Sequence, residues 1–150
     1  MKLFPVPKTA LFVELKLRDE HCPPHVHVED EEVPWEARFE FSFVSDAVLL
    51  MDVDPIEDAP STRAIDRIKR AITANLAKCR KEWWERIGTC CIDNRWMHLT
   101  PGGEIALLGE REKGAGQIGA VSYDAKTREL GVRMKNGSVH TKKAGKGTGQ

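Results

Sequence analysis

The sequence lacks both a long hydrophobic run and a net charge. The 150-residue chain has no stretch of about 18 apolar residues, the length at which a transmembrane helix becomes a candidate. Its first residues also lack the apolar core of a secretory signal peptide. We therefore expect a cytoplasmic protein without a membrane partner. The 23 basic and 23 acidic side chains balance, which argues against a nucleic-acid-binding role for the chain as a whole.

Cysteine is also scarce, with four residues at positions 22, 79, 90 and 91. Adjacent Cys90 and Cys91 cannot easily pair with each other without strain, and cytosolic proteins keep their thiols reduced. We therefore expect four free thiols. The Cys90-Cys91 pair followed by His98 suggests a zinc site, but its spacing matches no familiar zinc finger.

The balanced charge hides an uneven distribution. Residues 125–150 carry seven basic side chains against the single acid Glu129, so this part has a net charge of +6 and the preceding part −6. The Gly/Lys-rich residues 142–150 predict a disordered basic tail. This excess of cations either serves solubility or contacts a nucleic acid or the acidic residues 29–32.

Hydrophobic periodicity predicts an α+β fold. Alternating apolar and polar residues indicate strands at 9–18, 25–29 and 35–44, and a short apolar run indicates a more buried strand at 48–53. Apolar residues then recur every three to four positions, which predicts one long helix from Ser61 to Arg86, capped by Ser61 or Thr62 and ended by Gly88.

These elements predict an N-terminal antiparallel sheet of three to four strands that packs on one long helix, followed by a small C-terminal β-meander. The Asn136-Gly137 pair is a strong hairpin signal within this meander. The expected boundaries are 1–88 for the sheet-plus-helix domain, 89–103 for a linker, 104–141 for the meander and 142–150 for the tail.

The most distinctive stretch is residues 19–29, with three of the five histidines and the only Pro-Pro pair. Alternation places His25, His27 and Glu29 on one face of a strand and the valines between them on the other. His21, in the preceding turn, could fold back towards them. We expect no resident cofactor unless His21, His25 and His27 bind Zn²⁺ or Ni²⁺.

The same polar face supports a second interpretation, which is RNA cleavage without a metal. His25 and His27 would serve as general base and general acid, and Arg18 would stabilise the phosphorane. Further cations are candidates for contact with RNA or a protein partner: Lys16, Arg38, Arg67 and Arg70. Two plainer alternatives stay open, namely a solvated sheet face with salt-bridged pairs and an edge strand that pairs with a partner.

Residues 19–28, with Ala37-Arg38-Phe39 and an Ile-rich helix that ends in Trp83 or Trp84, resemble a bacterial family of domains of unknown function. The hallmark of that family is a His-x-Pro-Pro-His-x-His-Val core, and the resemblance covers roughly Phe4 to Ile87. It directs attention to His21, Pro23, Pro24, His25 and His27. It also implies a toxin–antitoxin-type or mobile-element accessory protein that acts on RNA or on a protein partner.

The chain continues well beyond the helix, where members of that family usually stop. Residues 118–140 resemble a KTSC-type β-meander, on the strength of the Tyr123-Asp124 turn, the Leu130-x-Val132 strand and the Asn-Gly turn. This second resemblance implies a fusion of two partner proteins in one chain.

Overall fold

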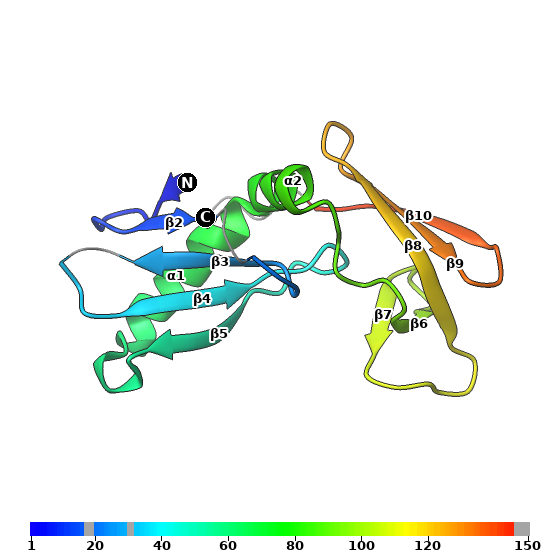
Figure 1. Ribbon diagram of the computed structural model, residues 1–150, viewed down its shortest axis with the longest axis horizontal. Helices are drawn as coiled ribbons and strands as arrows, with labels where there is room; N and C mark the ends of the chain where they lie inside the picture. The colour runs from blue at the N-terminus through cyan, green and yellow to red at the C-terminus, as the bar shows by residue number, and fades with distance from the viewer. Residues whose placement is uncertain (17–19, 30–31, 146–150) are drawn as a thin grey trace.

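The computed structural model describes residues 1–16, 20–29 and 32–145. Within these ranges the protein is α+β, with two antiparallel five-stranded sheets and two α-helices (Figure 1). The predicted α+β class is therefore confirmed. None of the described helices is long and apolar enough to cross a membrane.

The first sheet follows the order of the chain, β1-β2-β3-β4-β5. Its strands are β1 (Lys2–Pro5), β2 (Phe12–Glu14), β3 (His25–Glu29), β4 (Glu36–Glu40) and β5 (Leu49–Asp54). Val13, Val28 and Ala37 lie side by side on its buried face, as the cross-strand register shows. The alternation correctly predicted β3 and β4, whereas β1 was not expected and brings the sheet to five strands.

Two helices replace the single predicted one. A short 3₁₀-helix, η1 (Ile56–Asp58), precedes α1 (Thr62–Ala74), and α2 (Leu76–Ile87) follows after the one-residue junction at Asn75. The Asn75 side chain donates to the Ala71 carbonyl at 2.8 Å, and such side-chain bonds compete with helical backbone bonds. Ile72 and Leu76, on either side of the junction, both remain buried, so the apolar period continues through the break.

The predicted ends of the helical region are confirmed. The Ser61 hydroxyl accepts from the Ala64 amide at 3.2 Å, as an N-cap does. Gly88 adopts the left-handed conformation, with φ of 78°, and terminates α2.

The second sheet has the order β10-β9-β8-β6-β7. Its strands are β6 (Trp96–Leu99), β7 (Ile105–Leu108), β8 (Gly116–Asp124), β9 (Glu129–Met134) and β10 (Val139–Lys143). The hairpin predicted at Asn136-Gly137 connects β9 to β10. Strand β6 lies within residues 89–103, which were predicted to be a linker. Strand β10 extends into residues 142–150, which were predicted to be a disordered tail. Residues 146–150 of this predicted tail lie outside the described part.

The two sheets share one hydrophobic core. The rings of Phe43 and Tyr123 meet edge to face with centroids 5.0 Å apart. The guanidinium of Arg80, only 1% exposed, donates to the carbonyls of Ser42, Ser45 and Gly145 at 2.8 Å each. It also donates to a carboxylate oxygen of Asp46 at 2.9 Å. These contacts join the loop after β4, α2 and the chain beyond β10.

A disulfide between Cys22 and Cys91 overturns the expectation of four free thiols. The two cysteines are 69 residues apart in sequence, so only the folded chain reveals that they are neighbours. The remaining cysteines, Cys79 and Cys90, are free and buried. Burial raises the pKa of each of these thiols to about 12.

Candidate metal centre

Three side chains converge at the start of β3. His25 and His27 belong to this strand, and Glu20 comes from the segment that precedes it. The distance from His27 Nε2 to Glu20 Oε1 is 3.1 Å, and that from His25 Nε2 to Glu20 Oε2 is 3.4 Å. One ligand atom from each residue lies within 4.8 Å of the others. We call Glu20, His25 and His27 the candidate metal centre, or the metal centre for short.

The metal centre is buried, which argues against the alternative of a solvated sheet face at His25 and His27. His25 is 1% exposed and His27 is 6% exposed, and the Glu20 side chain is 4% exposed. Helix α2 places the indole of Trp83 beside the His25 ring, with ring centroids 5.4 Å apart. Alternation assigns a side chain to one face of a strand, but it does not reveal what packs over that face.

The hydrogen bonds of the two rings orient them towards Glu20. His25 Nδ1 lies 2.8 Å from the Pro23 carbonyl oxygen, and His27 Nδ1 lies 2.9 Å from Glu36 Oε1. Both partners are acceptors, so each Nδ1 carries the proton and donates it. His27 Nε2 also lies at hydrogen-bond distance from Glu20 Oε1, 3.1 Å. In its neutral form, each ring presents the lone pair of Nε2 to Glu20. Metal-binding histidines characteristically have this arrangement, with the second nitrogen bound to a carbonyl or carboxylate.

Lys16 holds Glu36 in place behind His27. The Lys16 ammonium lies 2.6 Å from Glu36 Oε1 and 3.5 Å from Glu29 Oε2. Burial alone would raise the pKa of Glu36, but the hydrogen bonds from Lys16 and His27 outweigh it and lower the pKa below its ordinary value. The hydrogen bond to Glu36 raises the pKa of Lys16 in turn. Glu36 therefore stays ionised and keeps its hold on the His27 Nδ1 proton.

One carboxylate oxygen of Glu20 lacks a hydrogen-bond donor among the described residues. Glu20 Oε2 is buried and has no hydrogen-bond partner among the described residues, and its neighbour, His25 Nε2, offers a lone pair when the ring is neutral. A buried carboxylate oxygen without a partner is costly. Either of two additions would satisfy this oxygen. One is a proton on His25 Nε2, which would be donated to Glu20 Oε2, and the other is a metal cation between the three side chains.

The spacing of the ligand atoms suits a metal cation. Zinc binds nitrogen and oxygen ligands at about 2.0–2.1 Å in tetrahedral geometry, which places neighbouring ligand atoms about 3.3–3.4 Å apart. The two distances from Glu20 to the Nε2 atoms, 3.1 and 3.4 Å, are close to this edge length. These two distances end on different oxygens of Glu20, and one ligand atom from each residue lies within 4.8 Å of the others. The side chains would therefore move closer together to bind the ion through one carboxylate oxygen.

The other predicted site residues have different environments. The exposed His21 has its ring centroid 6.0 Å from that of His25 and is not part of the metal centre. Arg38 Nε donates to both carboxylate oxygens of Asp52, at 2.9 and 3.1 Å. Arg67 and Arg70 lie on α1, half-buried and exposed respectively. Arg18 lies outside the described residues.

Glu20 is the member of the metal centre that sequence reasoning missed. It lies in a segment without helix or strand structure, where periodicity gives no information about direction. The available signal was its place next to His21, since a carboxylate beside clustered histidines is a potential ligand. The alternative zinc site at Cys90, Cys91 and His98 loses one ligand, because Cys91 is committed to the disulfide.

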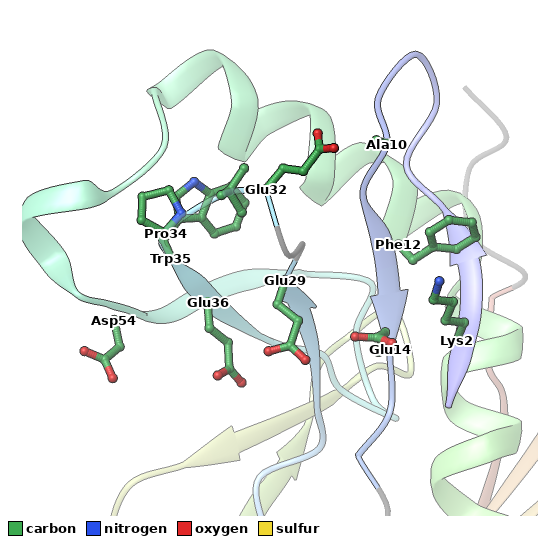
Figure 2. Close-up of a pocket in the computed structure, with 11 residues that line it drawn as sticks. Lys2, Ala10, Phe12, Glu14, Glu29, Glu32, Pro34, Trp35, Glu36 and Asp54 are labelled. Carbon is green, nitrogen blue, oxygen red and sulfur yellow. The ribbon is translucent and has the colours of Figure 1, made fainter.

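An acidic cavity of about 780 Å³ opens beside the metal centre. Figure 2 shows the side chains of Glu14, Glu29, Glu36 and Asp54 directed towards the same side of the sheet. Glu36 belongs both to this cavity and to the hydrogen bond with His27. Its carboxylates outnumber its one lysine, Lys2, whose ammonium lies over the Phe12 ring at 4.5 Å. The cavity therefore attracts cations to the neighbourhood of the metal centre.

Comparison of the chain with family models, curated proteins and solved structures gave no match. The resemblance to a domain family of unknown function and that to a KTSC-type meander therefore stay predictions. The geometry of the metal centre is what indicates a function.

Proposed function

We propose that this protein binds one divalent transition-metal ion, Zn²⁺ or Ni²⁺, through Glu20, His25 and His27. The observation that carries the proposal is the orientation of the two imidazoles. Both Nδ1 atoms donate to fixed acceptors, and both Nε2 atoms are directed at the buried Glu20 carboxylate. Glu20 Oε1 lies 3.1 Å from His27 Nε2, whereas Oε2 has no hydrogen-bond partner among the described residues. Imidazole and carboxylate ligands together suit zinc and nickel.

The ion would connect strand β3 to the irregular segment that precedes it. His25 and His27 are fixed on β3, whereas Glu20 belongs to an irregular segment. Because the three ligands are not assembled in the unfolded chain, metal binding stabilises the folded state. Three protein ligands leave a fourth tetrahedral position for water, which would give the ion Lewis-acid character.

RNA cleavage by His25 and His27 with Arg18, in a toxin–antitoxin-type or mobile-element setting, stays a prediction. Metal-independent cleavage needs imidazoles that reach the phosphodiester. Burial of both rings and their hydrogen bonds to Pro23 and Glu36 favour the metal-binding role instead.

Metal analysis and a competition titration test the proposal. Purified protein, freed of metal by a chelator and dialysed, is titrated with Zn²⁺ in the presence of a chromophoric chelator. We expect one ion per chain, and loss of binding in Glu20→Gln, which keeps the shape of the side chain but removes its charge. Glu57→Gln is the matched control, because Glu57 is exposed in η1. Absence of binding, or equal binding in Glu20→Gln, would refute the metal centre.

A further inference from the structure

The Cys22–Cys91 disulfide anchors the segment that carries the third metal ligand. Cys22 lies two residues after Glu20 and directly before Pro23, whose carbonyl accepts the proton of His25 Nδ1. The bond joins this segment to Cys91, beyond the end of α2, with the two Cα atoms 5.5 Å apart. In the sequence, Cys22 therefore lies between Glu20, which belongs to the metal centre, and Pro23, which accepts the His25 proton.

The segment from Glu20 to Pro24 is held in place without secondary structure of its own. These residues belong to no helix or strand, so no sheet ladder positions Glu20. At the downstream end, the Pro24 carbonyl accepts from the Phe41 amide at 3.0 Å. Upstream of Pro24, the disulfide is the covalent restraint nearest to Glu20. The direction of the Glu20 carboxylate therefore depends on the disulfide more than that of either histidine does.

The disulfide is accessible from outside, and the protein's own thiols cannot attack it. Cys22 is exposed and Cys91 is half-buried. The free cysteines, Cys79 and Cys90, are buried, and burial raises the pKa of each to about 12. The attacking species in thiol–disulfide exchange is the thiolate, which these two residues do not supply at neutral pH. An external reductant must therefore open the bond.

We propose that the Cys22–Cys91 disulfide controls metal binding, so that its reduction by an external dithiol weakens the affinity of Glu20, His25 and His27 for Zn²⁺. This inference rests on the proposed metal-binding function. Loss of supporting contacts around metal ligands typically costs 10–100-fold in affinity, and we expect a loss of about that size. Where the bond is oxidised the ion is held, and where it is reduced the ion is released more readily.

The exchange is balanced by the dithiol. Its first thiolate attacks Sγ of the exposed Cys22, forms a mixed disulfide and releases the thiolate of Cys91, which takes up a proton. The second thiol of the reductant then displaces Cys22 and leaves as an intramolecular disulfide. Two electrons and two protons pass from the dithiol to the protein.

The test compares Zn²⁺ affinity in three samples by chelator competition: the oxidised protein, the protein reduced with a phosphine, and Cys22→Ser/Cys91→Ser without reductant. A phosphine replaces the dithiol in the assay because dithiols bind zinc themselves. We expect the Kd to rise about 10–100-fold in both the reduced protein and the double variant. Reoxidation of the reduced sample should restore the original Kd, and phosphine should leave the double variant unchanged.

Equal Kd values in the oxidised and reduced protein would overturn the redox control while leaving the metal centre intact. Tighter binding on reduction would also overturn it, and its loss in the double variant would show that a freed thiolate of Cys22 or Cys91 binds the ion. Absence of binding in the oxidised protein would overturn the proposed function and the control together. Should the double variant fail to fold, as judged by circular dichroism, the reversible change in the native sequence decides the outcome.

Discussion

Zinc should raise the thermal stability of the metal-free protein by an amount that depends on ligand concentration. An ion that binds only the folded chain contributes RT ln(1 + [L]/Kd), which is about 2.7 kcal/mol at 100 times the Kd. For a chain of 150 residues, with about 2–4 °C per kcal/mol, this corresponds to a rise in Tm of about 5–11 °C. Scanning calorimetry or circular dichroism with increasing Zn²⁺ measures the shift.

Substitution of Glu20 separates a metal centre from a buried ion-pair cluster. Without metal, Glu20 Oε2 lacks a hydrogen-bond partner, so Glu20→Gln should leave the metal-free protein as stable as the native one or more stable, because a buried charge is removed. The amide could also donate to the lone pair of His25 Nε2. The increase in Tm with Zn²⁺ should disappear in this variant and persist in Glu57→Gln.

An ion-pair cluster predicts the opposite result. If a protonated His25 or His27 stabilised the Glu20 carboxylate, Glu20→Gln would break a buried pair and cost about 3–5 kcal/mol without any metal. Such a loss, together with no effect of Zn²⁺ on the native protein, would refute the reasoning that assigns an ion to this place.

Two further predictions concern residues outside the metal centre. Folding raises the pKa of Cys79 and Cys90 from an ordinary value of 9.0 to about 12, so the contribution of these thiols to the free energy of unfolding should be fully present below pH 9 and should fall as the pH rises from about 9 towards 12. Urea unfolding at pH 8 and pH 10.5 measures this fall. The same fall in a Cys90→Ala variant would contradict the role of Cys90. Replacement of the buried Arg80 by Ala leaves three backbone carbonyls and the exposed Asp46 carboxylate without their donor and should cost about 3–5 kcal/mol. Exposed Arg70→Ala should cost less than about 0.5 kcal/mol, and a loss below about 1 kcal/mol for Arg80→Ala would show that the carbonyls find other partners.

Local sequence patterns predicted those strands, helix ends and turns that are determined by residues close together in the sequence. Alternation located β3 and β4, Ser61 and Gly88 marked the ends of the helical region, and the Asn-Gly pair marked the last hairpin. Each of these signals operates over a few residues, through side-chain direction, capping or turn geometry. The division of the helical region at Asn75 was not predicted, because the apolar period continues across it.

Features that depend on distant segments were not predictable from pattern. The face of His25 and His27 was correctly inferred, but their burial depends on Trp83 from α2 and on the segment that carries Glu20. Cys22 and Cys91 are brought together by the fold across 69 residues. Of the three side chains that converge, the sequence pattern pointed to His25 and His27, whereas Glu20 and the surroundings were not predicted.

The buried guanidinium of Arg80 has a consequence for how the chain can be divided. It lies on α2, which follows the first sheet, yet one of its acceptors is the Gly145 carbonyl near the C-terminal end of the second sheet. The Lys142 ammonium likewise donates to the Val44 carbonyl at 3.1 Å. A fragment that ended at Gly88 would leave the Arg80 guanidinium without one of its four acceptors and the ring of Phe43 without its contact to Tyr123. The two halves are therefore suited to act as complementing fragments, each supplying the other's missing core.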